Sequence, residues 1–359
     1  DWLSKNWDQA TNRLNHAEMI HAWANLPFVI GGRETSVAVP PIGRKLKKPL
    51  DRKTIVARLK ALAPVEHALA VEYLYAYYSL GINAGPGVSE PSNTASEKER
   101  RCFTAAKEVY QVAVDEMRHL RWVNEALSAI DEKVPILSRA KVIGEDVDGD
   151  GRALNRPYEL LPLTPQQLDW FIKVELPSQQ IDPDGDEDTI DGMYTHILLS
   201  VQSSREFNEQ QKELLSHYVK TIIDEGADHV ERFQRAKDAL ASLRPEEYLV
   251  VTKKPSKLPA GTNLRKLQVV VDTSYVTVLE TLDYTFTRGD LQHGEMLHAA
   301  IRAMINMDDA ARLLARKGHG ALFSTPEGRR VAKGSHKAKP ITRSLRDMRS
   351  VDRVKVLTT

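Results

Sequence analysis

Four long segments of this 359-residue chain repeat apolar residues with the spacing of amphipathic helices, and each carries a glutamate within its apolar stripe. In AVDEMRHLRWVNEAL, which spans residues 113–127, Glu116 and His119 both interrupt that stripe. Burying a carboxylate without a partner is costly, so a helix avoids such a position or neutralises the charge. The pattern therefore requires a fold in which helices supply partners for one another's buried polar groups.

The same interruption recurs on the three other segments. The candidate ligands are Glu66, Glu116, His119, Glu175, Glu225 and His229. Four carboxylates and two imidazoles are the set that a di-iron or di-manganese carboxylate centre takes from a four-helix bundle. Carboxylates bridge and neutralise divalent cations, and imidazole suits iron. We therefore expect two iron ions, with manganese as the alternative metal.

The expected division of ligands between the two ions follows from helical spacing. Glu116 and His119 would hold one ion, and Glu225 and His229 the other. Glu66 and Glu175 would be bridging or terminal ligands. The competing interpretation is a bundle whose buried polar pairs satisfy each other without metal.

The remaining sequence predicts an all-α chain with long loops. Asp51 is the expected N-cap of a first helix that Gly81 closes, with Pro64 as a kink or a fresh start. Residues 132–164 contain several prolines and form a long loop. The further expected helices cover residues 96–131, 165–180, 190–202, 206–243, 267–286 and 293–317. The β-branched run VVVDTSYVTV, within the sixth of these seven helices, also fits a strand.

Composition excludes several classes of function. A hydrophobic content of 42% and a charged content of 28% are typical of a globular protein, and a net charge of +1 gives no signal for nucleic acid or membrane. No apolar run approaches ~18 residues, so we expect no transmembrane helix. The single cysteine, Cys102, excludes an internal disulfide or a Cys-rich zinc site and fits a reducing cytoplasm. Phosphate-binding glycine loops, a serine nucleophile elbow and a Rossmann fingerprint are absent from the sequence.

Five segments between about residues 55 and 240 resemble a known family in the order of its blocks. They are PVEHALAVEYLYAYYSL, VAVDEMRHLRWVNEALSAID, YELLPLTPQQLDWFIKVELPS, DGMYTHILLSV and IIDEGADHVERF. They are similar to the ferritin-like domain typified by iminophenylpyruvate dimer synthase, which occurs in bacterial biosynthesis of bisindole pigments and related alkaloids. The resemblance implies that the six candidate ligands stand at metal-binding positions.

The resemblance also implies an organisation and an activity. We expect an N-terminal arm at 1–50, a ferritin-like four-helix bundle at 51–245, a C-terminal helical extension at 246–320 and a basic tail at 321–359. The expected activity is that of a non-haem di-iron oxidoreductase acting with O2 or peroxide on a small, amino-acid-derived metabolite. A non-catalytic metal-binding or scaffold protein is the alternative. The basic arms are expected to be solvated or to contact a second copy of the chain.

Two departures from the family's pattern affect the ligand assignment. Glu72 stands where the family tends to carry proline, so it competes with Glu66, whose face is the more apolar. Glu225 and His229 are four residues apart rather than three, and Asp228 could substitute for one of them. Both spacings keep the side chains on one helical face.

Three further candidates are weaker. Glu295 and His298 repeat the Glu-x-x-His spacing, with Glu280 on the preceding helix, and exposed helical surface is the alternative reading. Two acidic loops could hold a weakly bound calcium ion through Asp146, Asp148 and Asp150 or through Asp182, Asp184 and Asp186, but each lacks the closing glutamate of a calcium loop. Tyr73 shares a face with Glu66 and is the candidate redox-active tyrosine, whereas core packing is the alternative for it.

Overall fold

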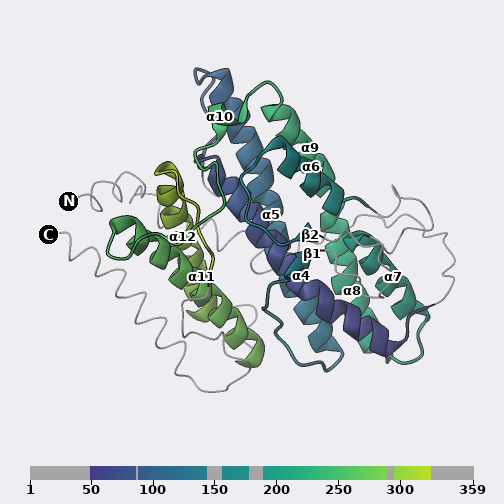
Figure 1. Cartoon of the computed structure of the whole chain (residues 1–359). Helices are drawn as coiled ribbons and strands as arrows, with labels where there is room; N and C mark the ends of the chain where they lie inside the picture. Colours follow the sequence, from purple (N-terminus) through teal and green to yellow (C-terminus); the bar gives the residue numbers. More distant parts are fainter. Residues whose placement is uncertain (1–48, 86–87, 144–155, 178–188, 289–294, 325–359) are drawn as a thin grey trace.

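The computed structural model describes residues 49–85, 88–143, 156–177, 189–288 and 295–324, and their regular secondary structure is almost entirely helical (Figure 1). The two long helices of the bundle are α4 (Arg52–Ser79) and α5 (Glu97–Ala129), which pack along each other. The other helices are α6 (Pro165–Val174), α7 (Ile190–Ser203), α8 (Glu209–Gly226), α9 (His229–Leu240), α10 (Pro245–Tyr248), α11 (Asn263–Arg288) and α12 (Glu295–Arg316). The all-α fold class is confirmed.

Helix α4 lies at the centre of the molecule. Every residue from Val65 to Ser79 is buried, which is the pattern of a helix that is covered on all sides. Helix α5 packs on it, α8 and α9 pack on α5, and α12 approaches α4 from the side that Figure 1 shows in green and yellow-green. A side chain in this part of α4 is therefore kept from water whichever way it points.

The ends of the two long helices follow the expected capping chemistry. The Asp51 carboxylate accepts from the Thr54 backbone N–H at 2.7 Å, and the Ser96 hydroxyl accepts from Glu99 N–H at 3.2 Å. Pro64 lies inside α4 and does not end it. Gly81 follows α4 at φ +66°, where a Cβ would come within 2.6 Å of a Val250 methyl group.

Three sequence-based expectations need correction. The helix expected at 165–180 ends at Val174, and the helix expected at 206–243 is two helices that meet at residues 227–228. The loop expected at 132–164 contains the short antiparallel strands β1 (Val142–Ile143) and β2 (Arg156–Pro157). The β-branched run at 269–278 is helical. The expected helix is thus confirmed, and the strand alternative is wrong. Residues 270–277 are all buried, so packing overrides the strand preference of the residues.

The helix pair α11–α12 is joined to the bundle through a buried histidine. The Tyr275 hydroxyl donates to His67 Nε2 at 2.8 Å, and His67 Nδ1 donates to the Leu137 carbonyl at 3.0 Å. Burial lowers the pKa of His67 to about 3, so the ring is neutral and can accept from the tyrosine. One imidazole thereby connects α4, the loop after α5 and α11.

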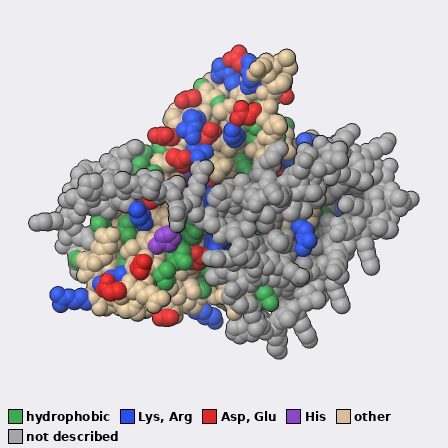
Figure 2. All heavy atoms as spheres, turned by 180° about the vertical axis from the view of Figure 1, so that it is seen from behind, with side chains coloured by type: hydrophobic (Ala, Val, Ile, Leu, Met, Phe, Trp, Pro, Cys, Tyr) green, Lys and Arg blue, Asp and Glu red, His purple; other side chains and the backbone are tan. Residues whose placement is uncertain are grey.

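Charges on the described surface are of mixed sign. Figure 2 shows lysine, arginine and acidic side chains interspersed over the described part of the face opposite to that of Figure 1. No helix within the described ranges is long and apolar enough to cross a membrane. The expected calcium loops at Asp146–Asp150 and Asp182–Asp186, residues 1–48 of the N-terminal arm and residues 325–359 of the basic tail lie outside the described residues.

We predict that Tyr275→Phe lowers the free energy of unfolding by about 1 kcal/mol, because it leaves the buried His67 Nε2 without its hydrogen bond. Urea titration of both proteins measures the difference. Tyr248→Phe is the matched control, since its buried hydroxyl has no hydrogen-bond partner among the described residues and its loss should not lower stability. Equal effects of the two substitutions would contradict the assigned role of Tyr275.

Candidate metal centre

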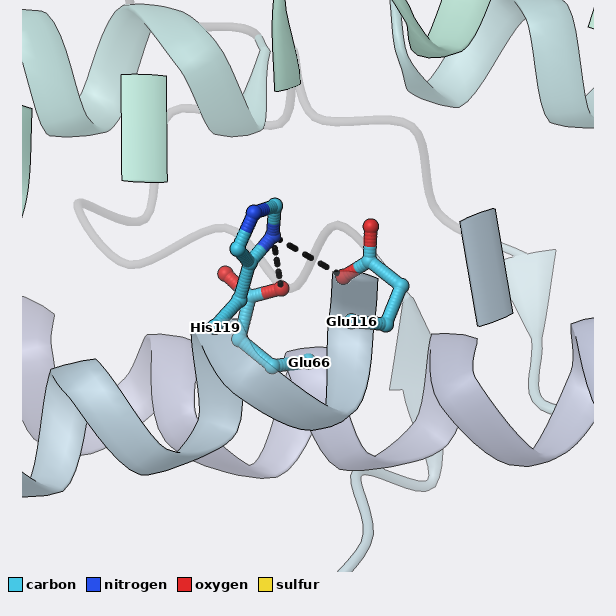
Figure 3. A group of neighbouring side chains, drawn as sticks. All are labelled: Glu66, Glu116 and His119. Carbon is cyan, nitrogen blue, oxygen red and sulfur yellow. Dashed lines mark ion pairs between the residues drawn. The ribbon is translucent and has the colours of Figure 1, made fainter. Parts of the chain in front are cut away.

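One group of candidate ligands forms where α4 meets α5. Glu66 comes from α4, and Glu116 and His119 come from adjacent turns of α5 (Figure 3). His119 Nδ1 lies 3.4 Å from Glu116 Oε2 and 3.8 Å from Glu66 Oε2. All three side chains are buried, and their ligand atoms lie within 4.8 Å of one another, which is the arrangement of a metal-binding group.

A second group shares Glu116 with the first. His229 Nδ1 lies 3.2 Å from Glu116 Oε1 and 3.1 Å from Glu175 Oε2. The imidazole rings of His119 and His229 are stacked, with their centroids 5.4 Å apart. Glu116 therefore turns one oxygen to each group and is the carboxylate placed to bridge two ions.

Irregular backbone positions the second group. Glu175 is the C-cap of α6, with its N–H bonded to Phe171 O at 3.1 Å. His229 is the first residue of α9, immediately after the interruption at Ala227 and Asp228. A helix interruption can absorb one extra residue, and here it lies within the Glu225–His229 spacing that departs from Glu-x-x-His.

Glu225 lies apart from both groups. Its Oε2 is 2.5 Å from Arg118 and 3.9 Å from Nε2 of His119, on the ring edge that faces away from Glu66 and Glu116. The structure thus places Glu225 next to His119, and not in the second group beside His229 where the sequence suggested it. Asp115 faces His229 in the same way as Glu225 faces His119: its Oδ2 lies 3.5 Å from Nε2 of the His229 ring.

The other sequence candidates are placed as follows. Glu72 accepts from the Glu159 backbone N–H at 2.9 Å and belongs to neither group, so the structure brings Glu66 and not Glu72 to the centre. Asp228 pairs with Arg232 at 2.7 Å and approaches Asp115 and His229. The side chains of Glu295 and His298, at the start of α12, lie outside the described residues.

Two tyrosines donate to the candidate ligands. Tyr73 Oη donates to Glu175 Oε1, and its ring packs against Phe171 and Phe233. Tyr194 Oη, from α7, donates to Glu66 Oε1 at 2.5 Å. Each tyrosine occupies one oxygen of a carboxylate and leaves the other directed at a histidine. The sequence did not single out Tyr194, although its helix was expected.

Burial and neighbouring charges shift the pKa values of the ionisable side chains in this core. Burial and the neighbouring Glu116 raise the pKa of Glu66 well above its usual range, and burial and Glu175 raise the pKa of Glu116. Burial lowers the pKa of His119. Burial alone would lower the pKa of His229, but its hydrogen bonds to Asp115, Glu116 and Glu175 hold it well above the usual value.

This donor set fits two divalent cations. Glu116 Oε2 is buried without a hydrogen-bond partner, although it lies beside His119 Nδ1. Like-charged carboxylates that crowd a buried space are stabilised by divalent cations, which carboxylate and imidazole donors bind well. Glu66, Glu116 and His119 would hold one ion, and Glu116, Glu175 and His229 the other.

A cavity leads to the first group and to Glu175. Asp191, Tyr194, Gly226 and Ala227 line it together with apolar side chains. The apolar lining is Leu69, Val174, Pro177, Ile190, Ile222 and Ile223. A small molecule in this cavity would lie against the carboxylates in largely apolar surroundings.

Comparisons with known proteins agree with this fold. The chain matches the ferritin-like family over residues 59–283. It is similar to the crystal structure of a ferritin-like protein from Caulobacter vibrioides, with a TM-score of 0.54 and 16% identity, over 78% of this chain and 100% of that chain. A search of curated proteins found no match. The family match covers more than half of the sequence, so the chain belongs to the ferritin-like family.

Proposed function

We propose that this protein is a non-haem di-iron oxidoreductase that acts with O2 or peroxide on a small organic substrate. The observation that carries the proposal is the pair of buried ligand groups that share Glu116 at the foot of a cavity. A purely structural polar core would not need a route for small molecules. Manganese remains the alternative metal, because the same donors bind it.

Metal ions bound here would supply redox chemistry, and the chain would provide their coordination and the surroundings of the substrate. Tyr194 and Tyr73 each hold one oxygen of Glu66 or Glu175, so the second oxygen of each carboxylate stays directed inward. The apolar cavity wall excludes water from the substrate. Tyr73 is the proposed redox-active tyrosine, because its hydroxyl touches a ligand of the second group.

The substrate class rests on resemblance. The sequence blocks similar to those of the iminophenylpyruvate dimer synthase family favour an amino-acid-derived metabolite in a biosynthetic pathway. A ferritin-like protein that binds metal without turnover is the second candidate, because the same ligand groups would serve it.

We predict that the protein purified from iron-replete cells contains about two iron ions per chain and that Glu116→Gln contains fewer than about one, because both ligand groups lose a member. Elemental analysis of the purified proteins measures this. Glu72→Gln is the control, since that carboxylate is equally buried on α4 but bonds to a loop N–H. Wild-type protein without metal would refute the proposal.

Measuring oxygen uptake distinguishes an enzyme from a protein that only binds metal. The ferrous protein is mixed with O2 and candidate amino-acid-derived substrates, and oxygen consumption and substrate loss are followed together. An enzyme consumes substrate in fixed proportion to O2 over many turnovers. Slow oxygen uptake that no substrate accelerates would instead support the metal-binding protein.

Gly226 offers a test of the cavity. A Cβ built there meets nothing within 4 Å, and the residue lines the cavity, so Gly226→Leu places a side chain in that space. We expect unchanged iron content and at least about tenfold lower kcat/KM, which corresponds to about 1.4 kcal/mol of lost transition-state binding. Gly85→Ala, outside the centre, controls for expression and handling, because a Cβ there makes only ordinary contacts, from 3.5 Å. Full activity of the Gly226 variant would mean that the substrate does not use this cavity.

A further inference from the structure

Arg118 pairs with two carboxylates, Asp115 and Glu225, each of which faces Nε2 of one histidine of the centre. Its guanidinium lies 2.5 Å from Asp115 Oδ1 and 2.5 Å from Glu225 Oε2, and its side chain is only 12% exposed. Trp122 covers it, with the ring centroid 5.7 Å from the guanidinium carbon. A guanidinium has several N–H donors in a planar fork, so it can hold two carboxylates at once.

The two histidines have matching surroundings. In each ring Nδ1 faces the carboxylates of a ligand group. In each ring Nε2 faces one carboxylate outside those groups, which is Glu225 for His119 and Asp115 for His229. Histidines that bind metals through one nitrogen usually present the other N–H to a carboxylate, which fixes the tautomer and the ring orientation.

We propose that Glu225 is not a metal ligand but an outer-sphere carboxylate that Arg118 holds behind His119, as the counterpart of Asp115 behind His229. The inference rests on the proposed di-metal function. The inner ligands are then Glu66, Glu116, His119, Glu175 and His229. Arg118 is a positioning residue, because it acts on both histidines through the carboxylates that face them.

The position of Glu225 follows from competing interactions. To reach an ion beside Nδ1 of His119, its carboxylate would have to leave Arg118 and pass to the other side of the imidazole. That move would break the ion pair between Glu225 and the largely buried guanidinium of Arg118, and removing one partner from a buried ion pair is strongly unfavourable. The structure thus favours the outer position.

Cobalt titration tests this without any assay of activity. Co²⁺ is added to metal-free wild-type protein, Glu225→Gln, Arg118→Gln and Glu125→Gln, and the visible d–d absorption is recorded, since it depends on the inner ligands. Glu125→Gln is the matched control, because Glu125 pairs with Arg121 on the same helix at 2.7 Å and is outside the centre.

The expected results differ between the variants. Glu225→Gln binds as many cobalt ions as wild type with an unchanged absorption spectrum and about tenfold lower affinity, as is usual for loss of an outer-sphere partner. Arg118→Gln changes the spectrum, because the released Glu225 can reach an ion. Glu125→Gln matches wild type in both properties.

Loss of one cobalt ion or an altered spectrum in Glu225→Gln would show that Glu225 is a ligand and overturn the inference. If that variant does not fold, an unchanged spectrum in Arg118→Gln would overturn it equally. Wild-type protein that binds no cobalt at the centre would refute the proposed function itself, an outcome distinct from either of these.

Discussion

The structure depends on the burial of Glu116 between two histidines and two other glutamates. One oxygen of this carboxylate faces His119 and the other faces His229. Burial and the nearby Glu175 raise its pKa, so the fully ionised core is unfavourable without a compensating charge. Helix packing at this point is therefore set by electrostatics as well as by apolar contact.

Regular and irregular backbone contribute differently to the centre. Helices α4 and α5 supply the first ligand group from uninterrupted helix, where one turn separates Glu116 from His119. The second group uses a helix end at Glu175 and a helix start at His229. The same interruption lies next to Gly226 and Ala227 in the cavity wall, so one backbone irregularity positions His229 and forms part of that wall.

Much of the centre was predictable because helical periodicity reports which residues face the core. Five of the six candidate ligands lie in the two groups. Periodicity could not predict the interruption after Gly226, since it assumes an unbroken helix. It also could not predict that Arg118 pairs with Glu225, because that contact joins α5 to α8.

The surroundings of the ligands were harder to predict than the ligands. Asp115 precedes Glu116 in the sequence and gave no signal of its own, because its role depends on where His229 lies. Tyr194 looked like an ordinary aromatic residue on a short helix, and only the packing of α7 near α4 brings its hydroxyl to Glu66. Such outer contacts arise from tertiary packing, which a single sequence hardly predicts.

Anomalous diffraction from crystals of the iron-loaded protein, with data collected on both sides of the iron absorption edge, tests the central claim most directly. The account predicts two strong peaks in the bundle, one beside Glu66, Glu116 and His119 and one beside Glu116, Glu175 and His229, with Glu116 contacting both. A bundle without peaks, or with a single peak at the Asp115, Asp228 and His229 group, would contradict it.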